Sequence, residues 1–445
     1  MAFTLISYAQ GPAITSWLQN TTVTGTYYVS GNSTAIDNNI LVNCQKVEYS
    51  DDFVYITATG IPAYPTGPFQ DGNPSQASNQ NAIYKMPLFP QENTGNPDNT
   101  TGGNIGIFIN GVSLFDYRDG VAWNPQTEAL CGGPGNPPCP GGPMNPQDWR
   151  RDAIPAEMPG FDCSKAHPAM GNYHHHQNPS AFKLDINVVS DVCNLYDAEG
   201  LYAIDADEHS PLIGYAYDGF PIYGAYGYAN TDGTGGITRI KSAYSLRTEM
   251  TVRDTHADGS SVDMGAPINN TYPLGYFRED YKYTASDASD VLDEHNGRFA
   301  VTPEYPDGTY AYYATVDENW NSAYPYVVGP TFYGNRENRK VNSVNEATTV
   351  YTGSTAISEA EFEAMKFSVI PNPATDLIAV QVAGLAKDEL TVELIDLTGK
   401  AILQSKISAG TTIAYFDVAT VYAGTYFVRI SGDGNSTVRK VVVMK

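Results

Sequence analysis

The chain has 445 residues, which is longer than a single hydrophobic core usually supports. Two or more domains are therefore expected. Its formal charge is −24, from 49 acidic against 25 basic residues. Nucleic acid is not expected as a partner, because binding its phosphates requires a basic surface. No run of eighteen apolar residues occurs, and no transmembrane helix is therefore predicted.

The composition indicates a folded protein built mainly from strands. Hydrophobic residues make up 42% of the chain and charged residues 17%, which is typical of globular proteins. The 32 tyrosines, 41 glycines and 29 prolines favour short strands joined by many turns. We therefore predict a mainly β protein, with a large Tyr/Gly-rich antiparallel domain and long loops.

The N-terminal stretch 1–11, MAFTLISYAQG, is typical of the back half of a secretory signal peptide that lacks its basic region, or of a first strand. Residues 12–340 are predicted to form the large domain. Segments such as NILVNCQKVEYS and DDFVYITATG alternate polar with apolar residues, as strands do. Asn110-Gly111 lies between two apolar runs and predicts a hairpin turn.

Five cysteines allow at most two bridges within the chain. Cys131 and Cys139 flank GGPGNPP, a segment too rich in Gly and Pro to hold one shape by itself, so a disulfide there has an evident role. Cys163 and Cys193 are the next plausible pair, which leaves Cys44 free. The connectivity cannot be deduced from sequence alone.

Four of the seven histidines lie in the stretch 161–179, FDCSKAHPAMGNYHHHQNP. In an extended segment, His174 and His176 project to one face and His175 to the other. His167 lies across a Pro-Ala-Met-Gly turn and can fold back as a third ligand. Imidazole suits zinc, copper, iron or nickel, which predicts a divalent transition metal. The alternative is a polar pocket in which these histidines only form hydrogen bonds.

The segment 210–230, SPLIGYAYDGFPIYGAYGYAN, follows His209 and contains a second turn at Asp218-Gly219. We predict that His209 or Asp218 completes or orients the metal site. Asp218 could be a ligand, a partner that fixes an imidazole tautomer, a catalytic general base, or simply a turn residue. His256 and His295 lie in acidic loops and are predicted to be surface residues.

The composition changes near residue 341 to Ser, Thr, Ala and Glu, which predicts a linker over 341–366. A separate module is predicted over 367–445. It contains short strands about ten residues apart with Thr-Gly, Ala-Gly and Asp-Gly turns. This spacing favours a small antiparallel sandwich of the immunoglobulin-like kind.

This module resembles the C-terminal sorting domain of type IX secretion cargo from the Bacteroidetes. The resemblance rests on IPNPATD at 370–376, IDLTGKAIL at 395–403, AGTYFVRI at 423–430 and the basic last strand VRKVVVMK. It implies recognition by the type IX secretion machinery, and hence a secreted or cell-surface protein. It implies nothing about the activity of the cargo.

Residues 100–335 resemble the YHYH protein family, named for a Tyr-His-Tyr-His motif. The motif reads Tyr173-His174-His175-His176 here, with His in place of the second Tyr. His295 stands where a Cys would be expected before Asn-Gly. The other blocks that carry the resemblance are FINGVSLF (108–115), DWRRDAIP (148–155), HSPLIGYAYDGFPIYG (209–224) and NGRFAVTPEYPDGTYAYYAT (296–315). The resemblance implies no particular activity.

Several catalytic templates are absent: HExxH, GxSxG, GxxxxGK[ST] and the EF-hand spacing. Two function classes remain. The first is an exported protein, either a binding module or an enzyme, that uses zinc or copper held by His167, His174, His176 and His209. The second is a surface adhesion or glycan-binding module in which the tyrosines stack on an extracellular polymer and the histidines are structural.

Overall fold

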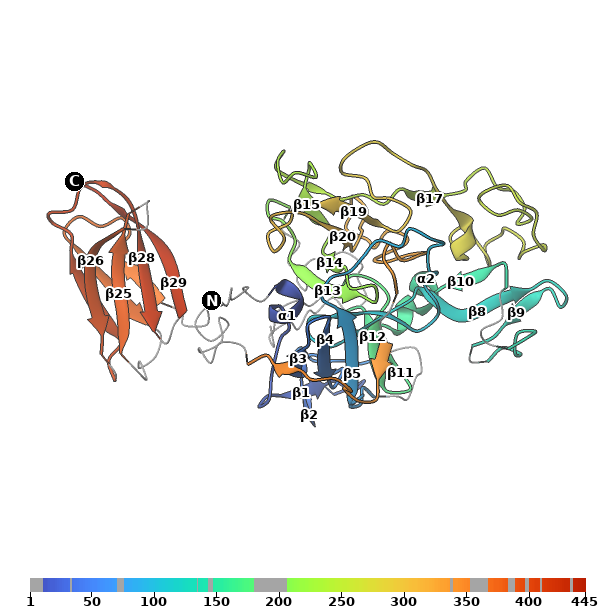
Figure 1. Ribbon diagram of the computed structural model, residues 1–445, viewed down its shortest axis with the longest axis horizontal. Coiled ribbons are helices and arrows are strands. Elements are labelled where there is room, and N and C mark those ends of the chain that lie inside the picture. Colours follow the sequence, from blue (N-terminus) through green and yellow to red (C-terminus); the bar gives the residue numbers. More distant parts are fainter. Residues whose placement is uncertain are drawn as a thin grey trace, which may run out of the picture. The chain divides into compact units, whose positions relative to one another are not determined.

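The computed structural model of the protein describes residues 11–32, 34–69, 76–133, 135–142, 147–179, 206–336, 339–352, 367–382, 389–396, 400–408, 410–432 and 435–445. The chain divides into two compact units, Met1–Tyr351 and Thr352–Lys445. Strands dominate both units, so the mainly β prediction is confirmed (Figure 1). The signal-peptide hypothesis concerns residues 1–11, of which only Gly11 is described.

A five-stranded antiparallel sheet forms one side of the first unit, in the order β21-β5-β4-β3-β22. Its edge strand β22 pairs with β3 and lies within the segment 341–366 predicted as a linker. A Thr-rich composition suits an edge strand as well as a linker. The strands are β3 (Cys44–Tyr49), β4 (Phe53–Ala58), β5 (Ala82–Pro87), β21 (Arg339–Val341) and β22 (Thr349–Val350).

An eight-stranded sheet has the order β11-β12-β7-β6-β13-β14-β20-β19. The predicted hairpin at Asn110-Gly111 joins β6 to β7. Two neighbouring pairs, β12/β7 and β14/β20, are parallel, because long connections bring those strands together, so the sheet is mixed rather than purely antiparallel. The strands are β6 (Asn104–Phe108), β7 (Ser113–Phe115), β11 (Ala166–Ala169), β12 (Asn172–His175), β13 (Leu212–Ala216), β14 (Pro221–Tyr223), β19 (Gly297–Ala300) and β20 (Thr309–Tyr313).

These two sheets share one hydrophobic core. Val54 and Ile56 of β4 belong to the same buried cluster as Ile107 of β6 and Ile213 of β13. Burial of such apolar side chains contributes about 25 cal/mol per Å² removed from water. A hydrogen bond of 3.0 Å between the hydroxyl groups of Tyr84 and Ser113 links the sheets within this core.

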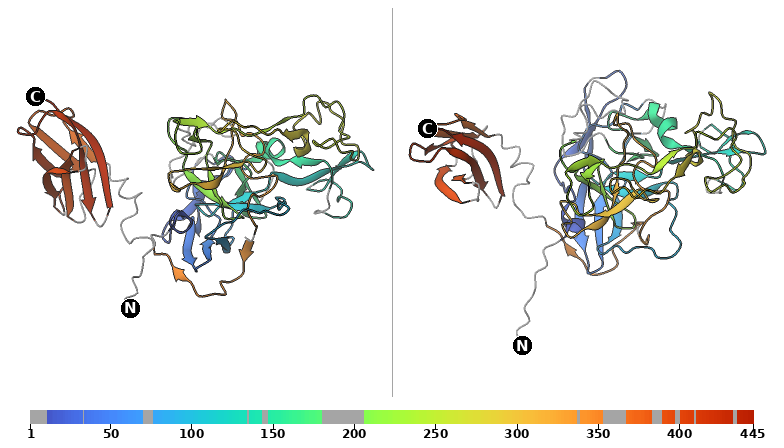
Figure 2. Two further views of the ribbon diagram at one scale, coloured as in Figure 1. Left: turned by 45° about the horizontal axis from the view of Figure 1, so that its top comes forward. Right: turned by 90° about the horizontal axis from the view of Figure 1, so that it is seen from above.

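Smaller sheets and short helical segments surround this core (Figure 2). The described helices are one or two turns long, and none of them is long and apolar enough to cross a membrane. These elements are β1 (Thr24–Tyr27) with β2 (Ile36–Leu41), β8 (Arg118–Asn124) with β9 (Ala129–Cys131) and β10 (Arg150–Asp152), β15 (Tyr226–Tyr228) with β16 (Ile237–Arg239), β17 (Tyr244–Leu246) with β18 (Tyr281–Tyr283), α1 (Pro12–Thr15), α2 (Ala153–Glu157), and the 3-10 turns Met158–Gly160 and Arg278–Asp280.

A fully buried ion pair fixes the long loops between β17 and β18. The Arg253 guanidinium donates to both carboxylate oxygens of Asp280 at 2.7 and 2.9 Å. Its remaining donors reach the backbone carbonyls of Ala266, Tyr272 and Pro273. Only 1% of Arg253 and none of Asp280 is exposed, so each charge depends on the other for compensation.

Replacing Arg253 by Met should destabilise the first unit by about 3–5 kcal/mol, because it leaves the Asp280 carboxylate buried without its counter-charge. Urea unfolding followed by tryptophan fluorescence measures this effect, since all four tryptophans precede residue 321. Lys241→Met removes a half-exposed ion pair with Asp290 and should cost only about 0–1 kcal/mol. Equal effects of the two changes would contradict the argument.

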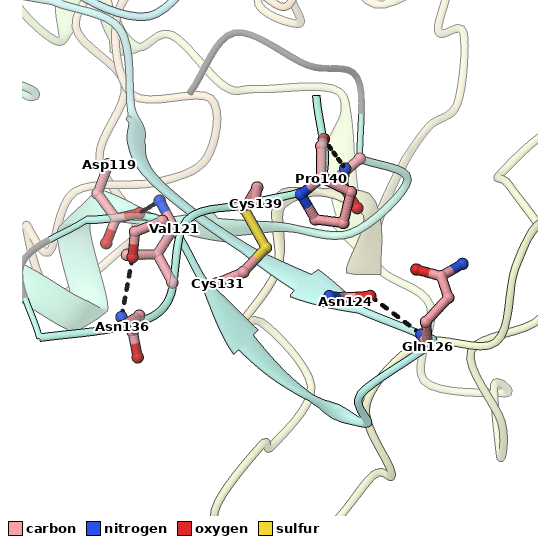
Figure 3. The surroundings of a disulfide bond; sticks show 10 residues. Asp119, Val121, Asn124, Gln126, Cys131, Asn136, Cys139 and Pro140 are labelled. Carbon is pink, nitrogen blue, oxygen red and sulfur yellow. Dashed lines mark hydrogen bonds between the residues drawn. A yellow bond between two sulfur atoms is a disulfide. The ribbon is translucent and has the colours of Figure 1, made fainter. Parts of the chain in front are cut away.

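The predicted disulfide between Cys131 and Cys139 is present and joins the end of β9 to the loop that follows it (Figure 3). Within the loop, the Asn136 side chain donates to the carbonyl of Gly132 at 2.9 Å. Cys44 is buried and free, as predicted. The second predicted pair, Cys163–Cys193, stays a prediction because Cys193 lies outside the described residues.

Changing both Cys131 and Cys139 to Ser should destabilise the first unit by about 2–3 kcal/mol, the loop-closure entropy of so short a segment in the chain-entropy model. The same urea titration measures the loss. Peptide mapping without reductant should recover the linked pair from the wild-type chain. Two freely alkylated thiols in that experiment would refute the bond.

The second unit is a two-layered β structure with its own core, as expected for an immunoglobulin-like sandwich (Figures 1 and 2). Val380 and Phe416 of one sheet pack in the same buried cluster as Val392 and Val428 of the other. One sheet contains β23 (Phe367–Ile370), β24 (Leu377–Val382) and β27 (Ile413–Asp417), and the other contains β25 (Leu390–Ile395), β26 (Ala401–Ile407), β28 (Gly424–Gly432) and β29 (Asn435–Val443).

Candidate metal centre

The β11–β12 hairpin brings the first two histidines together. Strands β11 and β12 pair antiparallel, with His167 directly opposite His174. Met170 and Gly171 form the tip with φ of +49° and +84°, as a type I′ turn requires. The prediction that the chain turns back between His167 and the motif is therefore confirmed.

His176 follows the last residue of β12 and lies on the same side as His174, as predicted from the two-residue period of a strand. The Nε2 atoms of His174 and His176 are 3.1 Å apart. With His167, they form a cluster whose ligand nitrogens all lie within 4.8 Å of one another. All three side chains are buried.

Backbone carbonyls fix the tautomers of two of these rings. Nδ1 of His174 lies 2.8 Å from the carbonyl oxygen of Asn172, and Nδ1 of His176 lies 2.7 Å from that of Asp116. A carbonyl oxygen only accepts, so each Nδ1 carries a proton and each ring turns its Nε2 toward the cluster. Burial, and then the neighbouring imidazoles, lower the pKa of His174 well below its usual range. The two Nε2 atoms thus face each other at 3.1 Å, where one cation could contact both.

Aromatic rings hold the histidines in place. Phe115, at the end of β7, stacks on His174 with ring centroids 3.8 Å apart. Phe161 meets His167 edge to face and lies nearly parallel to His176. These apolar rings pack against the imidazole rings of all three histidines.

Glu157, which the sequence did not single out, lies against this cluster. Its Oε2 is 3.0 Å from Nε2 of His167 and 3.2 Å from Nε2 of His176. This buried oxygen has no geometrically defined hydrogen bond and contacts the two nitrogens as an ion pair would. Burial alone would raise the pKa of Glu157, but the adjacent His167 and His176 outweigh it and hold this pKa well below its usual range.

Helix α2 carries Glu157 at its last residue. The N-cap Asp152 accepts from the backbone N–H of Ile154 at 2.9 Å and from the hydroxyl of Tyr326 at 2.6 Å. Burial raises the pKa of Asp152 to about 8. A helix of five residues is not stable by itself, so these contacts and the pairing of β10 with β8 position the carboxylate.

His175 points to the other face, as predicted. Its Nε2 lies 2.9 Å from the hydroxyl of Tyr64, and its Nδ1 lies 3.1 Å from the carbonyl oxygen of Lys165. Burial lowers the pKa of His175 to about 3, so the ring is neutral. Both nitrogens have protein partners, and His175 therefore has a structural role in this packing.

His209 and Asp218 do not join the cluster of described ligand groups. His209 precedes β13, with Nδ1 at 2.8 Å from the carbonyl oxygen of Ser210 and its ring against Tyr223 and Tyr228. The structure thus does not bring either predicted partner into the group of three histidines, because order along the motif blocks does not set proximity across the sheet.

Asp218 occupies the turn between β13 and β14, which is the turn interpretation left open by the sequence. Its carboxylate accepts from the hydroxyl of Tyr312 at 2.6 Å and from the backbone N–H of Gly334 at 2.8 Å. Burial raises the pKa of Asp218 to about 6. These contacts connect the turn to β20 and to the segment after it.

The two remaining histidines differ from each other in exposure. His256 is half-buried, and its Nε2 lies 3.9 Å from a carboxylate oxygen of Asp148. His295 is buried, which corrects the prediction of a surface residue, because its Nδ1 lies 2.6 Å from the hydroxyl of Thr331 and its ring packs on Tyr333. An acidic sequence neighbourhood gave no information about this packing.

Comparison with known proteins agrees with this architecture. Residues 368–444 match the secretion system C-terminal sorting domain, which marks the chain as cargo of the type IX system, exported to the cell surface or the medium. No curated protein matches the chain. Residues 83–325, which include the histidine cluster and Glu157, match the YHYH protein model over more than half of the chain. The chain belongs to the YHYH protein family.

Proposed function

We propose that the YHYH domain of this exported protein binds a divalent transition metal, zinc or copper, through Nε2 of His167, His174 and His176. The observation that carries the proposal is the convergence of three buried ring nitrogens within 4.8 Å. The contacts of His174 and His176 support it further, since each Nδ1 donates to a carbonyl oxygen and each Nε2 is left to face the cluster. Imidazole nitrogens are preferred ligands of both metals.

The residues themselves do three things at such a site. The carbonyl oxygens of Asn172 and Asp116 hold the ligating rings in one tautomer. Phe115 and Phe161 limit their rotation. If a coordination position is open, a bound divalent metal would act as a Lewis acid. If protein ligands fill every position, the metal would instead stabilise the folded domain.

Three tyrosines of the motif blocks cannot contribute to the alternative of a glycan-binding surface. Tyr173, Tyr223 and Tyr312 are fully buried, with hydroxyl groups that contact Asp162, Glu304 and Asp218. A sugar cannot stack on a ring that is packed inside the domain.

Metal content tests the proposal. The full chain, purified without chelator and challenged with zinc and with copper, should retain about one equivalent per chain after desalting. Elemental analysis measures the amount, and competition with a coloured chelator gives the affinity. A small fraction of an equivalent under both conditions would overturn the proposal.

A further inference from the structure

Glu157 adds a carboxylate to the three histidines. We propose that Glu157 is the fourth ligand of the metal, so that zinc is held in a closed shell of three imidazole nitrogens and one carboxylate oxygen. This inference rests on the proposed metal site and specifies its donor set. It assigns to Glu157 a direct bond to the metal through Oε2.

Three of the six distances among the four ligand atoms are close to the edges of a tetrahedral site, although Glu157 lies outside the group of three whose ligand atoms are all within 4.8 Å of one another. Zinc bonds to nitrogen and oxygen are about 2.0–2.2 Å long, so neighbouring ligand atoms around a tetrahedral ion lie about 3.3–3.6 Å apart. Oε2 of Glu157 lies 3.0 Å from Nε2 of His167 and 3.2 Å from Nε2 of His176. Nε2 of His176 lies 3.1 Å from that of His174. Each pair is a few tenths of an ångström closer than a tetrahedral edge, which a small outward shift of the side chains accommodates.

Oε2 of Glu157 approaches two ring nitrogens at once, a geometry that one shared metal ion would use. Nδ1 of His176 donates to the carbonyl of Asp116, so this ring offers only Nε2 to the cluster. Oε2 of Glu157 lies 3.2 Å from that nitrogen and has no hydrogen bond of its own. A cation coordinated by both atoms would compensate the buried carboxylate. A metal ion satisfies Glu157 and all three rings at once.

The residues around Glu157 position its side chain but leave its Oε2 without a hydrogen bond. Burial raises the pKa of Asp119 to about 6. The nearby Arg151 opposes this rise, and the charge of Glu157 adds to it. Arg151 pairs with Asp119. About 21% of the Glu157 side chain is exposed, against 10% for His167 and 3% for His176, so Glu157 is the most exposed of these three side chains. A ligated Glu157 therefore closes the most exposed side of the site.

Variants of the full chain separate this inference from the metal site as such. Glu157→Gln keeps the shape of the side chain and removes its charge. We expect its zinc affinity to fall by more than about 100-fold, which exceeds the 10–100-fold typical of residues that only orient ligands. Glu393→Gln is the matched control, because Glu393 is a similarly buried glutamate that pairs with Arg429 in the second compact unit.

Cobalt(II) reports the ligand set directly. Wild-type protein loaded with cobalt should show the strong visible absorption of a four-coordinate ion, and added azide should leave the spectrum unchanged because no position is open. Glu157→Gln should show an altered spectrum that responds to azide. The wild-type measurement is informative even where the variant fails to fold.

Each result has a definite meaning. If wild-type protein binds no metal, the proposed function itself fails. If it binds metal and Glu157→Gln has the same affinity and spectrum, only the assignment of Glu157 fails. A weaker affinity with an unchanged spectrum would make Glu157 an orienting residue, and an azide-sensitive wild-type spectrum would exclude the closed shell.

Discussion

Changing His174 and His176 together to Ala should abolish bound metal. The two rings supply two of the three nitrogens of the cluster, and they come from one strand and the residue after it. His167 would remain with Glu157 alone, a pair that cannot define a coordination geometry. Elemental analysis of the double variant after zinc loading should give no more metal than a chelator-treated control.

His256→Ala provides the control for this loss. His256 is half-buried beside Asp148, and it lies outside the cluster of the three ligand histidines. Its removal should leave metal content unchanged. Near-ultraviolet circular dichroism of each variant in the presence of chelator checks that the first unit is folded. A folded double variant that retains a full equivalent would contradict the assignment of the site.

The part of this site that a local pattern determines could be predicted from the sequence. The two-residue period of a strand determines that His174 and His176 share a face and that His175 does not. A Met-Gly tip between short segments determines that His167 folds back against His174. These relations depend only on residues within ten positions of one another.

The rest of the site depends on contacts that no local pattern encodes. Asp116, whose carbonyl oxygen accepts from His176, precedes it by 60 residues and contributes a backbone atom that any residue type would supply. Glu157 sits on a helix too short to show an apolar period. A signal existed only in the Asp152 N-cap and the Pro-Gly after Met158, which indicate a short helix without indicating what it faces.

The lack of a local pattern also explains why the sequence suggested residues that the structure does not bring to the cluster. Adjacency in the motif suggested His209 and Asp218 as ligands, but β13 lies on the far side of β6 and β7 from the β11–β12 hairpin. Parallel pairing of β12 with β7 requires a long crossover, which sequence alone does not reveal. In contrast, the sandwich of the second unit has short hairpins with turn residues, and its strands were therefore predictable.

Deleting residues 367–445 should leave the protein in the periplasm and reduce its surface display and release to background. The matched sorting domain, residues 368–444, lies entirely within the deleted segment. The hydrophobic core of the second unit, which begins with Phe367, has no residue in common with that of the first unit. The truncated chain should therefore fold and yet lack the structure that directs export.

Fractionation of cells that carry the type IX system measures this result, with the full chain and its truncated form behind the same signal peptide. The truncated protein in the periplasmic fraction should keep the urea midpoint of the first unit, read by tryptophan fluorescence, because all four tryptophans precede the deletion. The converse fusion, with residues 367–445 attached to an unrelated periplasmic reporter, should reach the surface or the medium. Normal surface display of the truncated chain would show that the export signal lies in the first unit.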